Sequence, residues 1–353
     1  MKRFTVQSTE DIQQVIHDNA RLHIIGRGTK TGLHHVDCPL LDMSRLSGMM
    51  VYQPDEYTFT AYAATPVKEI QAALHEHGQY LPCDPLLVEA GATLGGTIAC
   101  NLSGSRRFRY GGVRDFFLGA TVVDGMGRVF RVGGKVVKNA AGFDLAKFLV
   151  GSTGYYMLML DVTFKVFPDK AAFRSYQFDY PSIDDALSAV FYLNRQPFEL
   201  DALDLAPSPD GCALITRFSG TSDKLAEQIV RFSMALNQNT GVQTMTELND
   251  TQYWQEVNAL HQADSVVKVP LAPKQIPALD AKLKRVTRRY TVGGNIAWIH
   301  TDDMEKLSPI LEHLNLTGLH ILGESASPIV GKSLDHTFNG RVKTVLDPDA
   351  KFV

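Results

Sequence analysis

The chain has 353 residues, which is enough for two domains that each bury a hydrophobic core. Its hydrophobic content of 44% is ordinary for a globular protein, and a net charge of −3 gives no electrostatic basis for binding nucleic acid or an anionic membrane. The 4 cysteines are far apart and form no C-x-x-C pair. The sequence therefore supports neither a zinc site nor an iron–sulfur cluster, and we expect no metal centre.

The N-terminal segment MKRFTVQSTEDIQQVIHD has no apolar core and does not resemble a secretory signal. No uninterrupted apolar run approaches the roughly 20 residues that span a bilayer. We therefore expect a cytoplasmic protein without a transmembrane segment. Any association with a membrane is expected to go through a partner.

The first half of the chain alternates short predicted strands and helices with glycine-rich corners. Thr9 is a candidate N-cap, and the spacing of Ile12, Val15 and Ile16 predicts a helix over 9–20. The other predicted elements are a helix over 66–77, strands over 22–25, 58–63 and 158–166, a hairpin with strands over 118–123 and 128–132, and a helix over 145–150. This mixture indicates an α+β fold rather than one doubly wound parallel sheet.

After Pro168 glycine becomes sparser and the apolar periodicity becomes more regular. The pattern predicts helices over 182–194, 222–236, 278–290 and 304–314, the third of them basic on its exposed side, and strands over 212–218, 295–299 and 319–322. We expect a first domain over residues 1–169, a second α+β domain over 170–335, and a tail over 336–353 that returns to the first domain.

A first glycine-rich loop follows a predicted strand. It contains Gly26, Gly28 and Gly32, with Thr29 and Thr31 as additional hydroxyl donors. Glycine lets backbone N–H groups approach negative oxygens closely, so the loop suits a pyrophosphate. An ordinary glycine turn is the alternative. A Rossmann fingerprint fits less well, because the spacing is G-x-G-x-x-x-G and no clear βαβ unit follows.

A second loop, over residues 91–104, reads GATLGGTIACNLSG. A structural turn alone does not account for the spacing of the small and polar residues in this loop. These residues are Thr93, Gly95, Gly96 and Asn101, followed by Ser103 and Gly104. Aliphatic residues flank the loop and predict a rigid support. The two loops together predict a large phosphorylated cofactor that lies across the protein.

These loops resemble the FAD-binding domain of the vanillyl-alcohol-oxidase/PCMH family. Segments 24–32 and 92–101 are similar to its first and central flavin loops, 138–152 to its KN-x-AGYDL…GS segment, and 347–352 to its closing DP-x-x-x-F. The resemblance implies a PCMH-type FAD-binding domain of two subdomains and a smaller α+β cap domain on the substrate side. It implies cofactor contacts at Gly26, Arg27, Gly28, Thr29, Lys30, Gly32, Pro82, Ala92, Thr93, Gly95, Gly96, Ala99, Asn101, Ser103, Gly104, Arg114, Lys138, Asn139 and Leu158.

Four arginines follow the second loop: Arg106, Arg107, Arg109 and Arg114. One of them could face the flavin or bind a substrate carboxylate in bidentate fashion, and we favour Arg114 because it lies within the matched motif. A solvated basic loop is the alternative. The resemblance also places Lys138 near the flavin, where a lysine would help to hold negative charge on the reduced ring. A surface lysine is the alternative.

Two features bear on how FAD is held. Family members that attach FAD covalently carry a histidine in the first loop, where this chain has Thr29 and Lys30, so we expect noncovalent FAD. The family has a glycine where this chain has Met157 and a threonine where it has Leu160. The bulk of Met157 is expected to weaken close backbone contact with the adenine half.

Within the family the chain most resembles the FAD-binding subunits of bacterial glycolate oxidase. That likeness implies a dehydrogenase of glycolate, a small 2-hydroxy acid, in a complex with a second flavoprotein subunit and an iron–sulfur subunit. Alternatives are a free-standing FAD oxidoreductase for another 2-hydroxy acid or alcohol, and a scaffold subunit that has lost FAD.

The catalytic residues cannot be assigned from the sequence. The histidines of the second half show no metal-ligand spacing, and they are His261, His300, His313, His320 and His336. Lys268 stands where the glycolate oxidase subunits have an arginine, so the positive charge is kept without its bidentate geometry. No general base follows from these positions.

Overall fold

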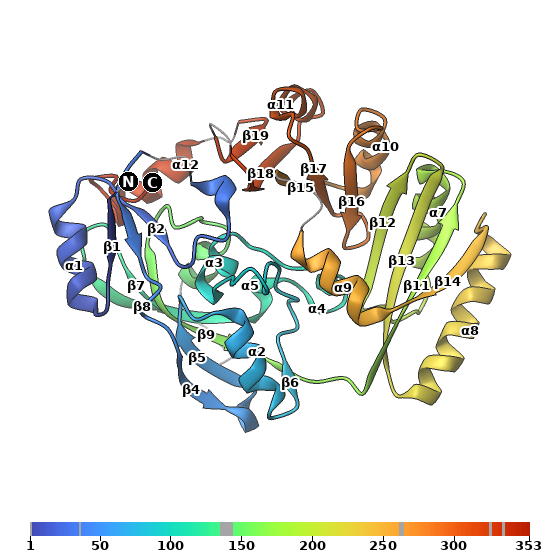
Figure 1. Ribbon diagram of the computed structural model, residues 1–353, viewed down its shortest axis with the longest axis horizontal. Helices are drawn as coiled ribbons and strands as arrows, with labels where there is room; N and C mark the ends of the chain where they lie inside the picture. The colour runs from blue at the N-terminus through green and yellow to red at the C-terminus, as the bar shows by residue number, and fades with distance from the viewer. Residues whose placement is uncertain (1, 35–36, 135–143, 261–264, 325–326, 334–335) are drawn as a thin grey trace.

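The computed structural model describes residues 2–34, 37–134, 144–260, 265–324, 327–333 and 336–353. Figure 1 shows two groups of strands side by side, with the end of the chain back beside its start. Within the described residues the strands form sheets of three, five, two and nine strands.

The three-stranded sheet is parallel and has the order β1-β3-β2. Helix α1 begins after an N-cap at Ser8, one residue before the predicted cap, because the Ser8 side chain accepts the Asp11 N–H. The chain end closes this layer, since Leu22 N–H donates to the carbonyl of Lys351 at 2.7 Å and Phe352 is buried in the same core. The elements are β1 (Arg3–Thr5), α1 (Thr9–Asp18), β2 (His23–Ile25), β3 (Leu40–Asp42) and α12 (His336–Leu346).

The five-stranded antiparallel sheet has the order β4-β5-β9-β7-β8 and shares a core with α2, α3 and α6. The predicted hairpin is confirmed as β7 and β8, and its turn is held by Asp124, which accepts the N–H groups of Met126 and Arg128. The elements of this part are β4 (Met49–Gln53), β5 (Thr58–Tyr62), α2 (Val67–His75), β6 (Gln79–Tyr80), α3 (Leu94–Ala99), α4 (Arg107–Tyr110), α5 (Val113–Phe116), β7 (Phe117–Val123), β8 (Val129–Gly133), α6 (Leu145–Leu149), β9 (Leu158–Lys165) and β10 (Phe167–Pro168), with short 3-10 helices at Thr31–Leu33 and Pro54–Glu56.

The second half forms one antiparallel sheet of nine strands with the order β14-β11-β13-β12-β16-β17-β15-β18-β19. Its elements are β11 (Ala172–Tyr180), α7 (Ile183–Leu193), β12 (Ala202–Ser208), β13 (Gly211–Gly220), α8 (Ser222–Asn239), β14 (Thr244–Leu248), α9 (Asp250–Ala259), β15 (Val266–Pro270), a 3-10 helix (Pro273–Gln275), α10 (Ile276–Asp280), β16 (Thr287–Thr291), β17 (Ile296–His300), α11 (Met304–His313), β18 (Thr317–Leu322) and β19 (Ile329–Gly331).

Alternation along the strands gives this sheet two buried faces. On β17, Ala297 and Ile299 join the core that contains α7, α8, α10 and α11. Ile296 and Trp298 point the other way and pack against the loops over 86–102 of the first half. The nine-stranded sheet therefore presents one face to the glycine-rich loops.

One predicted helix is wrong. Residues 278–290 form the end of α10, a turn and strand β16, because Tyr290 is fully buried and pairs with Ala297 on β17. The apolar spacing of Leu279, Leu283 and Val286 imitates a helix, but the following Thr287–Thr291 segment has a strand composition. The basic residues of this stretch divide in two: Lys282, Lys284 and Arg285 are exposed, as expected. Arg288 pairs with Asp280 and Arg289 with Asp204, and the two arginine side chains are at most 15% exposed.

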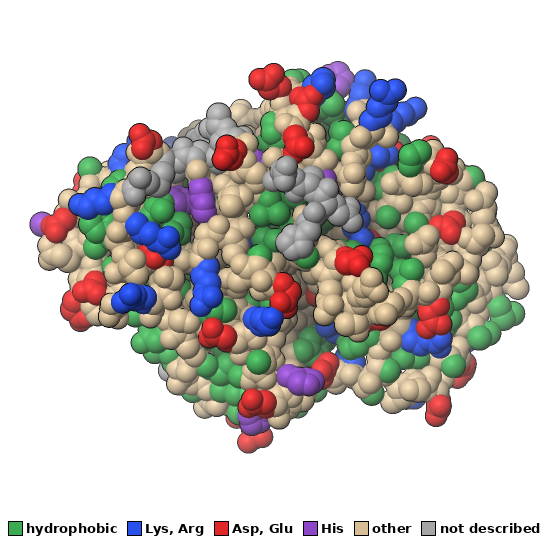
Figure 2. All heavy atoms as spheres, in the orientation of Figure 1, with side chains coloured by type: hydrophobic (Ala, Val, Ile, Leu, Met, Phe, Trp, Pro, Cys, Tyr) green, Lys and Arg blue, Asp and Glu red, His purple; other side chains and the backbone are tan. Residues whose placement is uncertain are grey.

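The visible surface carries charges of both signs. Figure 2 shows acidic and basic side chains interspersed over the visible face. Among the described helices, none combines the length and the apolar character needed to cross a membrane.

Candidate functional site

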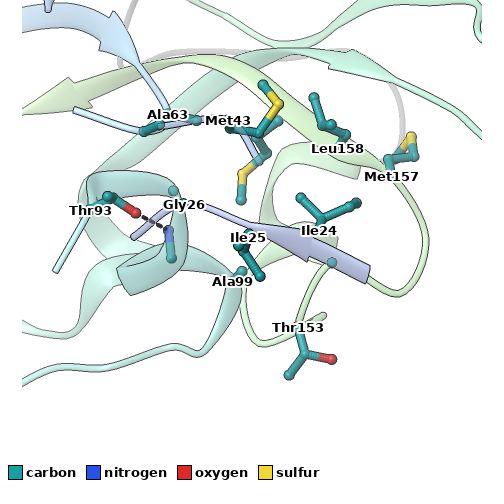
Figure 3. A pocket seen from close by; sticks show the side chains of 15 residues that line it. Ile24, Ile25, Gly26, Met43, Ala63, Thr93, Ala99, Thr153, Met157 and Leu158 are labelled. Atoms are coloured by element: carbon teal, nitrogen blue, oxygen red, sulfur yellow. Dashed lines mark hydrogen bonds between the residues drawn. The ribbon is translucent and has the colours of Figure 1, made fainter. Parts of the chain in front are cut away.

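Two adjoining cavities lie where β2, α3 and the segment 153–159 meet. Their volumes are about 460 and 440 Å³. Both are lined by Ile24, Ile25, Gly26, Thr93, Gly96, Ala99 and Thr153. We call the two cavities together the glycine groove. Figure 3 shows Met157 and Leu158 on one side of the first cavity and Thr93 on the other.

The groove exists because its loops pack too closely for side chains. A Cβ on Gly26 would come within 2.6 Å of Thr93 Oγ1, and a Cβ on Gly95 within 2.8 Å of the Ala63 side chain. Thr93 is the N-cap of α3, and its hydroxyl accepts the Gly96 N–H at 3.3 Å. Glycine at 26 and 95 is thus required by loop packing, which fixes the groove wall before any ligand binds.

The two ends of the groove differ in polarity. One end is apolar and is formed by Met43, Ala63, Met157, Leu158 and Met159. The other end is polar and is formed by Arg27, Gly28, Thr29, Lys30 and His34. Such a groove suits an elongated ligand with an aromatic part and a charged part.

Lys30 is the most informative polar side chain of the groove. The residue is only 6% exposed, and no carboxylate pairs with it among the described residues. Burial lowers the pKa of its ammonium group, and the nearby Cys100 thiol opposes that shift. A buried cation without an acidic partner is costly to fold, so the site is prepared for an anionic ligand.

About half of the sequence-predicted cofactor residues line the groove. They are Gly26, Arg27, Gly28, Thr29, Lys30, Thr93, Gly95, Gly96, Ala99 and Leu158. Lys138 and Asn139 lie outside the described residues. The predicted residues that do not line these cavities are Gly32, Pro82, Ala92, Asn101, Ser103, Gly104 and Arg114.

Several of these outlying residues join the two halves of the molecule. A Cβ on Gly32 would lie 2.7 Å from the carbonyl oxygen of His320 on β18. Asn101, at φ 49°, accepts a hydrogen bond from Lys268 Nζ of β15 at 2.6 Å. Burial, and next the charge of Arg107, lower the pKa of Lys268 to about 8. The second glycine-rich loop (residues 91–104), which we call the central loop, is therefore in direct contact with the nine-stranded sheet.

The arginines after the central loop have different partners. Arg109 donates to Asp201 at 2.9 Å, and the buried Arg106 lies 3.6 Å from the same carboxylate. Arg114 is exposed on α5, where its carbonyl accepts a hydrogen bond from Lys147. The arginine favoured from the motif thus lies away from the groove, and its role as a cofactor contact stays a prediction.

Sequence reasoning did not single out several groove residues. Thr153 and Gly154 have φ of 55° and 86° and turn the chain into the groove, a signal available in the Ser-Thr-Gly sequence. Met43 enters from the end of β3 and carried no local signal. Met157, in contrast, stood out in the sequence as a bulky residue in place of a glycine, and it is buried in the core beside the groove, where it lines the apolar end.

Comparison with known proteins agrees with this geometry. Residues 3–133 match the FAD binding domain family. The chain is 38% identical over 195 residues to glycolate oxidase subunit GlcE of Escherichia coli K12, covering 55% of each chain. It is 27% identical over 206 residues to a D-lactate dehydrogenase of Archaeoglobus fulgidus, covering 56% of this chain and 46% of that protein. The matches span about half the length of these relatives.

The fold as a whole has solved counterparts. The structure of p-cresol methylhydroxylase with bound substrate superposes with a TM-score of 0.76 at 13% identity, covering 98% of this chain and 86% of that one. The similarity extends over both halves of the chain, so the nine-stranded sheet belongs to the shared fold.

The groove fits the cofactor of this family. Its polar end offers glycine backbone and an unpaired buried lysine for phosphate oxygens, and its apolar end offers methionines and aliphatic side chains for a ring. With the match of residues 3–133, the chain carries a PCMH-type FAD binding domain within an α+β fold, and its cofactor is FAD.

Proposed function

We propose that this chain is the FAD-binding subunit of a multisubunit 2-hydroxy-acid dehydrogenase that converts glycolate to glyoxylate. The observation that carries the proposal is the groove with its unpaired Lys30, in a domain whose relatives include a glycolate oxidase subunit and a D-lactate dehydrogenase. The names of both relatives refer to small 2-hydroxy acids, glycolate and D-lactate.

The chemistry divides between cofactor and chain. FAD supplies an acceptor for two electrons from the substrate and a donor of single electrons to the next carrier. Residues of this chain would hold FAD without a covalent link, with Lys30 at its phosphates and Met157 at its adenine half.

Partners complete the proposal. All 4 cysteines are buried and unlinked, and no group of three or more metal-ligating side chains occurs among the described residues. We propose that electrons leave through an iron–sulfur subunit, and that a second flavoprotein subunit belongs to the same complex. The complex is proposed to be cytoplasmic, with membrane contact only through a partner.

A second candidate is a free-standing oxidoreductase for another 2-hydroxy acid, which the D-lactate dehydrogenase relative favours. The scaffold alternative conflicts with the FAD binding domain and with a groove that keeps its polar end.

The test is turnover of glycolate and D-lactate with a dye acceptor, by the purified chain alone and with its partner subunits. We expect low steady-state activity from the chain alone and a rise by orders of magnitude in the complex. Turnover of glycolate by the lone chain at roughly 1 per second or faster would contradict the need for partners. Preference for D-lactate would favour the second candidate.

A further inference from the structure

A separate cavity of about 960 Å³ lies between the nine-stranded sheet, helix α9 and the end of the central glycine loop. The sheet contributes Arg289 and Thr291 from β16 and Trp298 and His300 from β17. Gly104 and the neighbouring Ser105 line the same cavity from the first half. The cavity is therefore next to a loop that the family resemblance assigns to the cofactor.

Several polar groups in this cavity have no protein partner. Thr291 is 97% buried, and its hydroxyl makes no hydrogen bond within the described part of the chain. The same holds for His300 Nδ1 and for the side-chain oxygen of Asn258. Buried polar atoms are nearly always paired, so three unpaired atoms around one cavity indicate a polar occupant.

Arg289 supplies the positive charge of the cavity. Its Nε donates to Asp204 at 3.1 Å, and its Nη2 donates to the Tyr253 hydroxyl at 2.7 Å. Asp204 also accepts from the Ser105 hydroxyl and the Val292 N–H, so this carboxylate is already held by three donors. The Nη1 side of Arg289 has no acceptor among the described residues and remains available for an anion.

Tyr253 and His300 extend this set of groups. The Tyr253 hydroxyl accepts from Arg289, and its own proton has no acceptor in the described residues. Burial, and next the charge of Arg289, lower the pKa of His300, so its ring is neutral near pH 7 and offers an acceptor nitrogen. The other acidic side chain at the cavity, Glu256, is exposed on α9.

We propose that this cavity binds the 2-hydroxy acid, with Arg289 and Tyr253 on its carboxylate and His300 and Thr291 on its hydroxyl. The inference rests on the proposed function, because it takes the substrate class from there. It assigns residues that motif spacing did not reveal, since Tyr253, Arg289 and His300 come from three separate elements.

The experiment is a titration of the FAD-loaded chain with oxalate, a two-carbon analogue of glycolate without a transferable hydrogen. Binding is followed by tryptophan fluorescence, because Trp298 lines the cavity. The variants are Tyr253→Phe, which removes only a hydroxyl, and Thr291→Val, which replaces a hydroxyl with a methyl group of similar size. The matched control is Tyr176→Phe, since Tyr176 is buried on the same sheet but does not line the cavity.

We expect oxalate to quench the wild type, and its Kd to rise about tenfold or more in Tyr253→Phe, as for a lost hydrogen bond to a charged group. Thr291→Val should raise it less, and Tyr176→Phe should leave it unchanged. An unchanged Kd in both variants, or no oxalate binding to the wild type, would overturn the proposal.

A parallel readout separates this proposal from the proposed function. Reduction of the bound FAD by glycolate, with no effect of the two variants on oxalate binding or on the reduction rate, would keep the function and reject the cavity. Oxalate binding that depends on Tyr253, in a chain whose FAD no 2-hydroxy acid reduces, would keep the anion site and reject the function.

Discussion

At the scale of single residues, the site is marked by charges that cost stability. Lys30 and Lys268 are each at most 6% exposed, and no carboxylate pairs with either among the described residues. Burying an unpaired ammonium group opposes folding. Lys30 lines the groove, so ligand binding explains its burial, whereas Lys268 donates to the Asn101 carbonyl and joins the two halves.

Lys30→Met is therefore expected to separate stability from function. The apoprotein should become more stable, by about 1 kcal/mol or more, because a buried charge is removed while the apolar stem is kept. The Kd for FAD should rise at least tenfold. Urea unfolding of the apoprotein and an FAD titration measure the two effects. Lys68→Met, at an exposed lysine paired with Glu89, should change neither; an unaltered FAD affinity in Lys30→Met would remove Lys30 from the site.

Gly95 and Gly96 are expected to differ, although they are adjacent. A Cβ on Gly95 meets Ala63, so Gly95→Val should lower the melting temperature. A Cβ on Gly96 would lie 3.1 Å from Thr93 Oγ1 and 3.3 Å from Lys30 Nζ, and both residues line the groove. Gly96→Val should therefore abolish FAD content and keep the circular dichroism spectrum. Gly241→Val, with no atom within 4 Å of its added Cβ, is the control. Normal flavin in Gly96→Val would show that FAD does not use this wall.

Lys268 gives a pH-dependent prediction. Its pKa is about 8 in the folded apoprotein and 10.5 for the unperturbed group, so the unfolded chain binds more protons between these values. Stability should therefore rise from pH 8 to pH 10, by about 2 kcal/mol from this group. Lys268→Met should lose that contribution, which urea midpoints of both proteins at the two pH values measure. An identical pH dependence in both would contradict the assignment.

At the scale of elements, the contact between α4 and β12 joins the two halves. Asp201 is fully buried and accepts hydrogen bonds from Arg109, Ser219 and Tyr110, and Arg106 lies against it among aromatic rings. The hydrogen bonds that Asp201 accepts are strong because its carboxylate is negatively charged.

Asp201→Asn should lower the free energy of unfolding by about 3 kcal/mol, because Arg106 and Arg109 lose a buried counter-charge. Glu199→Gln removes only the exposed partner of Arg109 and should cost less than about 1 kcal/mol. Equal effects of the two substitutions in thermal unfolding would mean that Asp201 does not join the halves.

Most elements were predictable where the local signal was strong. The helices at α1, α2, α7, α8 and α11 follow from caps and apolar spacing. The wrong helix at 278–290 arose because tertiary pairing of Tyr290 with β12 and β17 overrides a local helical spacing. The strands β11 and β15 were not predicted because their partners are distant in sequence. Strand β12 was also not predicted, although it forms a hairpin with the next strand, β13.

The site likewise has one part that local sequence predicts and one part that only tertiary structure forms. The groove could be predicted because backbone loops build it, and glycine spacing records backbone shape directly. The cavity with Tyr253, Arg289 and His300 could not, because α9, β16 and β17 come together only through the antiparallel sheet. Arg114 illustrates the limit of motif position, since it lies within the matched segment and is exposed.

At the scale of the whole molecule, the chain places a cofactor groove in one half and a polar cavity against the other, with the central loop between them. This arrangement explains why substitutions in the nine-stranded sheet are expected to affect substrate without removing FAD.

The most direct test is an anaerobic titration of the purified chain, together with the proposed partner subunits, by glycolate, followed through the flavin absorption band. We expect a flavin spectrum before addition, bleaching of the band by glycolate, and full release of the yellow colour from the polypeptide on acid precipitation. A chain purified without flavin, or a flavin band that neither glycolate nor D-lactate bleaches in the presence of the partners, would contradict the proposed function.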